Sequence, residues 1–374
     1  MRPVPTPPPS SRPAPPEAVI VAGGFGTLLL PLTRNRPKHL LEVGGVPFLE
    51  HQVARLAAAG VGHVVLATSY RADLFEPVLG DGGRWGVRLD YVQEQEPLGT
   101  GGAIRNVADA LGDDPDGAVV ILNGDVLSGH DLPAQLADFE TRRDGRAVDV
   151  SLHLVEVADA RAFGCVPTDG SGRVTGFTEK SEHPVTNQVN AGCYVFRRRV
   201  VDGIPAGRVV SVERETFPGL VADGALVVGY VENAYWRDVG TPAALVAASR
   251  DLVLGDAPSP AVPAGTRDAE VDPAAEVAAT ARVGDGSVVL AGARVGDGAR
   301  VAGSVLMAGS VVGGGAEVLA SVLGPGARVG DGVRLEDVTV GDGACVEAGA
   351  TVAPGTRVDC GTVVGPSRTS ERQS

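Results

Sequence analysis

The chain has 374 residues and a formal net charge of −14, with 46 acidic and 32 basic side chains. This charge argues against nucleic acid or an anionic membrane as a partner, because both would be repelled. The length exceeds that of one ordinary core, so we expect two domains, and no segment reaches the roughly 18 uncharged apolar residues of a membrane span.

The N-terminal tail is rich in proline: residues 1–16 contain eight prolines and no apolar run. A signal peptide needs a continuous apolar centre, so we expect a disordered tail here instead. We expect a second short disordered tail at residues 365–374.

The first folded element is expected at residues 18–22, a short β-branched run that is typical of a buried parallel strand. Gly23, Gly24 and Gly26 follow directly. They allow the backbone to bend closely, so that successive N–H groups can converge on an anion such as a polyphosphate.

Lysine is rare in this chain: it occurs only at Lys38 and Lys180, and arginine supplies the other thirty positive charges. A compact ammonium is not equivalent to a planar guanidinium in a crowded phosphate site. Both lysines therefore become candidate site residues, against the alternative that two exposed lysines have survived by chance.

Apolar strands then alternate with helical stretches as far as about residue 124. We expect strands at 64–67, 89–92 and 118–122 and helices at 47–59 and 102–111. This alternation indicates a Rossmann-like α/β domain with a mainly parallel sheet, which binds ligands at the carboxyl ends of its strands. Residues 148–196, with a strand at 148–157 and a Gly-rich turn at 169–172, predict an antiparallel addition that makes the sheet mixed.

The last third of the chain is periodic. After the domain at 17–254 and a Pro-rich linker at 255–270, valine recurs every six residues between small residues. The valines fall at 283, 289, 295 and 301, at 305 and 311, and at 340, 346, 352 and 358. A six-residue period of this kind predicts a left-handed parallel β-helix of hexapeptide repeats at 271–364.

The glycine loop gains specificity from Pro31-Leu32-Thr33 and Pro37-Lys38, which follow it. Alone it matches neither the P-loop nor the GxGxxG pattern. Together these segments resemble the opening motif GGxGTRLxPLTxxxPK of the sugar-phosphate nucleotidyltransferases. Later segments resemble the same family in order and spacing: Glu96–Gly102, Asn123-Gly124-Asp125, Glu179-Lys180, Asn190-Ala191-Gly192 and Trp236–Pro242.

The resemblance extends over about residues 17 to 364 and is greatest to actinobacterial guanylyltransferases that act on mannose 1-phosphate. It implies nucleotide binding by Ala22, Gly23, Gly24, Gly26, Thr27, Lys38, Gln93, Glu94, Pro97, Leu98, Gly99, Thr100, Asn123 and Gly124. It implies sugar-phosphate binding by Gly164, Glu179, Lys180, Asn190, Ala191, Gly192 and Trp236. The implied catalytic residues are Lys38, Asp125, Lys180 and Asp238, with Asp125 and Asp238 as ligands of Mg²⁺.

The chemistry of the family suits these residue types. A sugar 1-phosphate oxygen attacks the α-phosphorus of a nucleoside triphosphate in line, and pyrophosphate leaves. Because both substrates are anions, the protein supplies positioning and charge neutralisation. Asp125 and Asp238 are hard oxygen ligands for a hard cation, although an Asp after a strand can also serve as a helix cap or turn residue.

The two lysines and Glu179 complete the expected contacts with substrate. Lys38 would hold the nucleotide phosphates and Lys180 the sugar phosphate. Glu179 would accept from sugar hydroxyls, or else be a solvated partner of Lys180. A carboxylate at Glu94 would accept from guanine N1 and N2 and favour GTP, unless Gln93 and Glu94 merely end a strand in solvent.

One residue departs from the motif: Leu28 stands where the family has arginine. A phosphate-directed arginine in phosphoryl transfer contributes on the order of 10³ to 10⁵ in rate, so its loss bears directly on activity. Arg34 or Arg36 would have to reach the phosphates instead. A catalytically impaired or regulatory nucleotide-sugar-binding homologue is therefore an alternative, as is the same reaction with another base or sugar, such as glucose 1-phosphate thymidylyl or adenylyl transfer.

The remaining expectations concern partners and location. Acyl transfer by the β-helix is disfavoured, because such enzymes use a histidine base and all six histidines precede the linker. The four cysteines form no CxxC pair, so we expect neither a zinc site nor a disulfide framework. We expect a cytoplasmic homo-oligomer that binds a nucleoside triphosphate and a sugar 1-phosphate.

Overall fold

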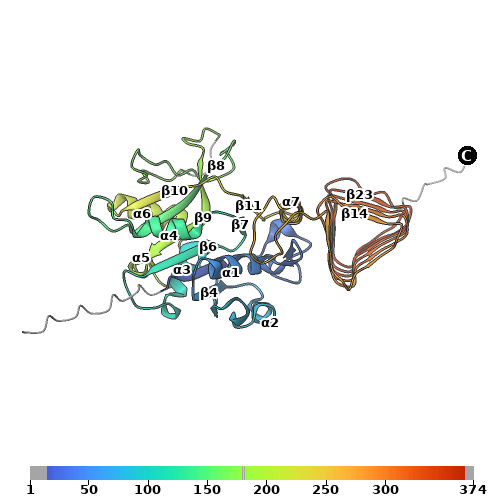
Figure 1. Cartoon of the computed structure of the whole chain (residues 1–374), viewed down its shortest axis with the longest axis horizontal. Coiled ribbons are helices and arrows are strands. Elements are labelled where there is room, and N and C mark those ends of the chain that lie inside the picture. The colour runs from blue at the N-terminus through green and yellow to red at the C-terminus, as the bar shows by residue number, and fades with distance from the viewer. Residues whose placement is uncertain (1–14, 179, 181, 367–374) are drawn as a thin grey trace, which may run out of the picture.

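The structure is a computed structural model that describes residues 15–178, 180 and 182–366. The predicted tails therefore lie outside the described residues, apart from positions 15, 16, 365 and 366. Two units follow each other along the chain: an N-terminal domain (residues 17–254) and a C-terminal parallel β-helix (residues 269–364), which Figure 1 shows in cross-section as a triangle.

A seven-stranded sheet forms the centre of the N-terminal domain, in the order β10-β8-β9-β6-β1-β4-β5. Its strands are β1 (Glu17–Ala22), β4 (His63–Thr68), β5 (Arg88–Gln93), β6 (Ala118–Asn123), β8 (Val150–Glu156), β9 (Gln188–Arg197) and β10 (Val227–Val231). β9 runs antiparallel to both of its neighbours, and every other neighbouring pair is parallel. The expectation of a mixed, mainly parallel sheet is confirmed.

Helices cover both faces of this sheet because its central strands are apolar on both sides. In β1, Val19 packs into one core and Ile20 into the other, and both are fully buried. One face holds α1 (Phe48–Ala58), α2 (Phe75–Leu79) and α4 (Leu132–Glu140); the other holds α3 (Gly99–Asn106), α5 (Arg198–Gly203) and α6 (Phe217–Ala222).

The remaining elements of the N-terminal domain surround this framework. They are η1 (Thr27–Leu29), η2 (Lys38–Leu40), β2 (Glu42–Val43), β3 (Val46–Pro47), η3 (Ala72–Leu74), η4 (Gly83–Trp85), η5 (Ala108–Ala110), β7 (Val126–Ser128), η6 (Val212–Thr216), β11 (Trp236–Asp238) and α7 (Pro242–Leu254). β7 and β11 form a separate two-stranded antiparallel sheet. This small sheet joins the segment that follows β6 to the segment that precedes α7.

The predicted helix at 102–111 differs from the structure at both ends. α3 begins at Gly99 and ends at Asn106, and a separate turn of 3-10 helix follows. Because glycine has low helix propensity, the start of this helix was predicted too late in the chain. Here they serve close packing, because a Cβ on Gly102 would lie 2.9 Å from the carbonyl oxygen of Arg208.

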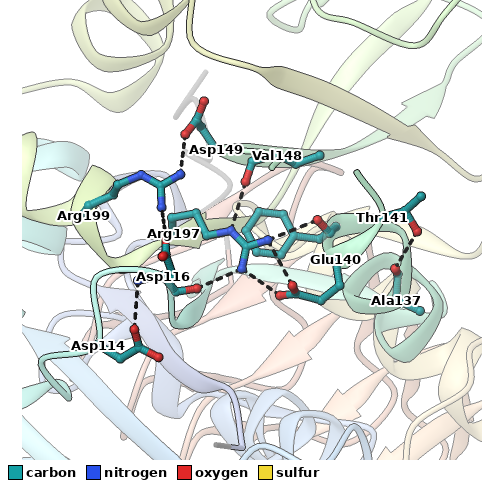
Figure 2. Close-up of polar contacts among 10 residues, drawn as sticks. Asp114, Asp116, Ala137, Glu140, Thr141, Val148, Asp149, Arg197 and Arg199 are labelled. Atoms are coloured by element: carbon teal, nitrogen blue, oxygen red, sulfur yellow. Dashed lines mark hydrogen bonds and ion pairs between the residues drawn. The ribbon is translucent and has the colours of Figure 1, made fainter. Parts of the chain in front are cut away.

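Arg197, at the end of β9, fastens the strand to its surroundings (Figure 2). Its guanidinium donates to the carbonyl oxygens of Val148 and Asp116, at 3.1 and 2.8 Å, and to both carboxylate oxygens of Glu140. It also lies 4.1 Å over the ring of Phe139. A nearly buried charge is tolerated here because the guanidinium is paired and hydrogen-bonded.

Three parallel sheets form the walls of the β-helix. The first contains β12 (Ala269–Val271), β15 (Ser287–Val289), β18 (Val305–Leu306), β21 (Val322–Leu323), β24 (Thr339–Val340) and β26 (Arg357–Val358). The second contains β13 (Glu276–Val277), β16 (Arg294–Val295), β19 (Val311–Val312), β22 (Arg328–Val329), β25 (Cys345–Val346) and β27 (Val363–Val364). The third contains β14 (Arg282–Gly284), β17 (Arg300–Ala302), β20 (Glu317–Leu319) and β23 (Arg334–Glu336).

The strict six-residue period is wrong for the middle of the β-helix. Ala269 pairs with Ser287, a step of 18 residues, but Val305 pairs with Val322, a step of 17. One corner accounts for the difference: residues 285 and 286 both have positive φ in the first coil, whereas Gly303 alone does in the next. The parallel β-helix is confirmed, and its left-handed sense stays a prediction.

The two units share an apolar interface. Leu29 and Leu32 of the N-terminal domain belong to the same buried cluster as Val288 and Met307 of the β-helix, with α7 contributing Leu252. The segment predicted as a linker also packs on the N-terminal domain, and the strand β12 begins inside the range predicted as linker. His51 Nδ1 lies 2.6 Å from the hydroxyl of Ser259 in this segment.

Candidate active site

The carboxyl ends of three neighbouring strands, β1, β4 and β6, lie at one edge of the sheet. In the register of β1 with its neighbours, Ala22 lies opposite Thr68 of β4, and Val21 lies opposite Asn123 of β6. The glycine loop, the segment after β4 and the Asn-Gly-Asp segment after β6 therefore start side by side. This is the edge at which ligands bind in open α/β sheets.

The glycine loop is shaped by its neighbours. The N–H of Gly24 donates to the hydroxyl of Ser69 at 3.2 Å, and the hydroxyl of Thr33 donates to the carbonyl of Gly26 at 2.9 Å. Gly26 has φ of +60°, and a Cβ there would lie 3.0 Å from Cβ of Lys38. The loop can thus pass close to the side chain of Lys38 only because residue 26 is glycine.

Lys38, Asp125 and Asp238 meet at the centre of this edge. Nζ of Lys38 forms an ion pair with Asp125, in which both side chains are mostly buried. Asp238 lies in β11, opposite Val126 of β7, and the N–H of Val239 donates to the carbonyl of Asp125 at 2.9 Å. A short antiparallel ladder therefore places the two carboxylates together.

The charges around this centre shift the pKa values of its members in opposite directions. Burial alone would raise the pKa of Asp125, but the ammonium of Lys38 outweighs burial and holds it below its usual value. Loss of solvent raises the pKa of Asp238, and the neighbouring charge of Asp125 raises it further. Burial lowers the pKa of His39 to about 3, so this histidine beside Lys38 is neutral.

Asp125 and Asp238 fit a hard divalent cation. The pKa of Asp238 stays raised although the charges of Lys38 and Lys180 both act to lower it, so these two adjacent carboxylates keep negative charge that a cation would compensate. Among the described residues, no cluster of three or more His, Cys, Asp or Glu side chains could hold a metal by itself. Mg²⁺ commonly takes one or two protein carboxylates and completes its shell with water and substrate phosphates, so Asp125 and Asp238 are enough to hold it.

The segment expected to bind the nucleoside is organised by its own side chains. The Glu94 carboxylate accepts from the N–H of Leu98 at 3.4 Å, and burial raises its pKa. The Thr100 hydroxyl donates to Glu213 and accepts from the N–H of Val212, each at 2.9 Å. Glu94 and Thr100 therefore hold the loop in place, while the exposed Gln93, Pro97 and Gly99 remain open to a ligand.

The residues expected to bind the sugar phosphate gather around β9. The N–H of Asn190 donates to the carbonyl of Gly164 at 3.3 Å, and Nε1 of Trp236 donates to the carbonyl of Ala191 at 2.9 Å. Gly192 has φ of +73°, and a Cβ there would lie 2.9 Å from the side-chain nitrogen of Asn123. The sugar and nucleotide segments therefore adjoin.

The Glu-Lys pair is described in part. Lys180 is exposed, and its charge acts to lower the pKa of Asp238. Glu179 lies outside the described residues, so its expected role stays a prediction.

The arginines proposed to replace the missing guanidinium are engaged elsewhere. Leu28 is 65% exposed. Arg34 forms an ion pair with Asp359 at 2.6 Å, and Arg36 forms one with Asp342. Both partners belong to the β-helix, and the expectation that Arg34 or Arg36 reaches the phosphates stays a prediction.

Sequence reasoning missed three residues that build the site. Ser69 accepts from the glycine loop, and the ring of Tyr70 lies 5.4 Å from that of Phe25. Nε2 of Gln52 donates to the carbonyls of Asn123 and Val126, which orients the turn that carries Asp125. Ser69 and Tyr70 follow the strand next to β1, so parallel pairing of these strands was the signal that could have found them.

Among the described residues, no helix has the length and apolar character that crossing a membrane requires.

Comparison with known families gives two matches. A family model described as "Nucleotidyl transferase" matches residues 17–253, and one described as "GMPPB C-terminal domain" matches residues 266–369.

Individual relatives agree with these matches. The chain is 56% identical over 247 residues to "Mannose-1-phosphate guanylyltransferase" of Mycobacterium tuberculosis, covering 66% of this chain and 67% of that protein. It is 38% identical over 228 residues to "Mannose-1-phosphate guanyltransferase" of Yarrowia lipolytica, covering 60% of this chain and 61% of that protein. The match thus spans less than two thirds of the fungal relative's length.

A solved structure resembles the N-terminal domain. HddC from Yersinia pseudotuberculosis, in a crystal structure complexed with GMP-PN, superposes with a TM-score of 0.53 and is 27% identical. The match covers 63% of this chain and 99% of that one.

Proposed function

The chain belongs to the nucleotidyl transferase family, and from this membership we propose that it transfers a guanylyl group from GTP to mannose 1-phosphate. The products would be GDP-mannose and pyrophosphate. The proposed substrates follow from the relatives named mannose-1-phosphate guanylyltransferase, the first of which is 56% identical. We propose that the reaction takes place in the cytoplasm and that the enzyme is a homo-oligomer.

One observation carries the proposal: Lys38, Asp125 and Asp238 come from three separate segments and meet at the ligand-binding edge of the sheet. Neither an ordinary helix cap nor a turn would require an ammonium paired with one of two neighbouring carboxylates. An in-line displacement on a polyphosphate does require this set of charges, because the reacting groups are anions.

Members of this family typically use a divalent metal. We propose Mg²⁺ held by Asp125 and Asp238, which when bound would neutralise charge on the α-phosphate. Lys38 keeps Asp125 ionised and ready to bind a cation. The glycine loop would bind the phosphates through its N–H groups, while Lys180, Glu179 and the segment 190–192 would orient the sugar phosphate.

The proposal for guanine rests on relatives as well as on Glu94. In the structure the Glu94 carboxylate faces the N–H of Leu98, so it shapes the loop that would contact the base. We propose that Gln93 and the backbone of residues 94–99 read the base edge, with Glu94 holding them.

Leu28 supports a second candidate, a homologue that binds nucleotide sugar without efficient turnover. The side chain is apolar and exposed where the family motif has arginine, and Arg34 and Arg36 are paired with the β-helix. A binding protein of this kind would make every contact described above but would lack the phosphate-directed guanidinium.

A pyrophosphate-release assay with GTP and mannose 1-phosphate tests both candidates. Turnover above that of an Asp125→Asn control supports the enzyme, and a panel of five triphosphates with several sugar 1-phosphates tests base and sugar. Binding without turnover, not recovered in Leu28→Arg, would leave only the regulatory homologue. Recovery in Leu28→Arg would show that the missing guanidinium was the defect.

A further inference from the structure

The segment between the glycine loop and Lys38 is contacted from outside by the last coils of the β-helix. The guanidinium of Arg357, in β26, donates to the carbonyl of Leu28 at 2.8 Å and to that of Leu30 at 3.2 Å. The residue between them, Leu29, is 1% exposed and packs in the apolar interface. One side chain of the β-helix thus holds the backbone on both sides of a buried anchor.

A second contact holds the other end of this segment. Arg36 pairs with Asp342, and the two side chains are only 19% and 16% exposed. The same Asp342 oxygen accepts from the side-chain amide of Asn35 at 3.2 Å. Asp342 therefore fixes the chain two residues before Lys38, which itself pairs with Asp125.

Together these contacts bracket the residues that would hold the nucleotide phosphates. Gly26 lies two residues before Leu28, and Lys38 lies two residues after Arg36. Thr33, inside this segment, is joined to its start by the hydrogen bond from its hydroxyl to the carbonyl of Gly26. A shift of this segment would move the glycine loop and the ammonium of Lys38 together, away from Asp125.

We propose that Arg357 and Asp342 are positioning residues for the nucleotide-binding loop, so that the β-helix sets the affinity for nucleotide without touching it. We call these two residues the loop clamp. The proposal rests on the proposed function, because it assigns residues 23–38 to the nucleotide. Arg36 then has a role as well, because its charge pairs with Asp342 and holds the loop on the side that faces the β-helix.

The clamp does not contribute to the interior of the β-helix. That interior is formed by aliphatic side chains such as Val318 and Leu335. Arg357 is exposed to solvent on one side, and its two acceptors are both main-chain oxygens of the loop. Removing the guanidinium should therefore loosen the loop while the β-helix stays folded.

The test compares Arg357→Ala, Arg357→Lys and Asp342→Asn with a matched control, Arg328→Ala, which removes an exposed arginine from the neighbouring sheet of the same β-helix. For Arg357→Ala and Asp342→Asn we expect KM for GTP to rise about tenfold, which corresponds to about 1.4 kcal/mol. KM for mannose 1-phosphate should stay unchanged. Arg357→Lys should recover part of the loss, because an ammonium still donates to a carbonyl.

Amide hydrogen exchange gives a readout that does not depend on turnover. Residues 23–38 should exchange faster in Arg357→Ala than in the parent and in Arg328→Ala, while β15 and β18 keep their protection. Equal exchange and equal KM for GTP in Arg357→Ala and Arg328→Ala would overturn the clamp. So would a parallel rise in KM for both substrates.

Failure of the proposed function would look different. If no sugar 1-phosphate supports turnover, the clamp is still tested by the dissociation constant of Mg-GTP and by loop exchange in the same four variants. Weaker binding in Arg357→Ala with normal exchange in β15 and β18 supports the clamp in that case as well. Unchanged binding and exchange contradict it.

Discussion

The N-terminal domain and the β-helix reach stability by different means. The β-helix repeats one arrangement, in which aliphatic residues from successive coils stack inside three parallel walls. In the N-terminal domain each important contact occurs once: Lys38 with Asp125, Arg197 with Glu140, Gln52 with Asn123. A substitution at one of these contacts should therefore cost function in the first unit, whereas a substitution in the second unit, away from the loop clamp, should cost only stability.

The sharpest test of this contrast exchanges aspartate for asparagine in both units. Asp125→Asn should lower turnover about 10³-fold, because a neutral amide is a poor ligand for a divalent cation and leaves Lys38 unpaired. Asp331→Asn is the matched change in the β-helix, where Asp331 accepts from the N–H of Gly314 at 2.7 Å. Its turnover should equal that of the parent, as measured by pyrophosphate release. A comparable loss in both variants would break the contrast.

Acid should destabilise the N-terminal domain first. All six histidines precede the β-helix, and burial lowers the pKa of four of them: His39 to about 3, His51 to about 4, His130 to about 2 and His153 to about 4. The unfolded chain takes up these protons near pH 6.5, and the folded chain does not. Stability is therefore lost as the pH falls below about 6.5, by about 1.4 kcal/mol per histidine between pH 7.5 and 5.5, or about 5.5 kcal/mol for the four.

Tryptophan fluorescence measures this loss selectively, because Trp85 and Trp236 both lie in the N-terminal domain. The urea midpoint followed by fluorescence should fall between pH 7.5 and 5.5. Hydrogen exchange of β18 and β21 should show that the β-helix keeps its protection at the lower pH. A midpoint that is constant or rises on acidification would contradict the assignment of neutral buried histidines.

In the β-helix, Val318→Ala should lower the free energy of unfolding by about 2 kcal/mol, because two buried methyl groups are lost and a cavity remains. Val318 is fully buried, whereas Val363 in the same unit is 61% exposed, so Val363→Ala is the control. Turnover at 25 °C should be unchanged in both. Thermal unfolding measures the difference, and a reduced turnover in Val318→Ala at a temperature where it is folded would count against separate roles.

The smallest effect is expected at the solvent-exposed contact between the units. Arg34 and its partner Asp359 are 51% and 67% exposed, and water and salt screen such a pair. Arg34→Ala should leave the melting temperature and KM for GTP close to the parent values. Arg36→Ala, which removes the more buried pair, is the comparison. Equal effects of the two substitutions would show that burial does not decide the strength of these contacts.

Much of the fold could be predicted because its signals are local. The apolar strands at 18–22, 64–67 and 118–122 and the periodic valines each reveal their own environment within a few residues. The shortened coils were not predicted from the six-residue period, because their length depends on the backbone conformation of one corner, at Gly303 and its equivalents. The start of α3 was not predicted, because its glycines allow close packing against residues 208–210 and sequence spacing does not reveal that contact.

Site residues could be predicted where the sequence motif itself contains the charged group. Residues that only support such a group from a neighbouring segment could not be predicted. Lys38, Asp125 and Asp238 were expected and lie together. Ser69 acts through one hydrogen bond to a main-chain N–H and Gln52 through two to main-chain carbonyls, a role that many polar residues could fill. The pairing of Arg36 with Asp342 joins residues far apart in the chain, and an outward-facing aspartate in a repeat carries no periodic signal.

The pairing of β11 with β7 also has a consequence for protein synthesis. Asp125 is made early, but the strand that brings Asp238 beside it is among the last parts of the N-terminal domain to leave the ribosome. Until then the nascent chain holds one carboxylate of the pair and lacks the other. We therefore expect an unfinished chain to be unable to consume GTP, so that activity begins only when this domain is complete.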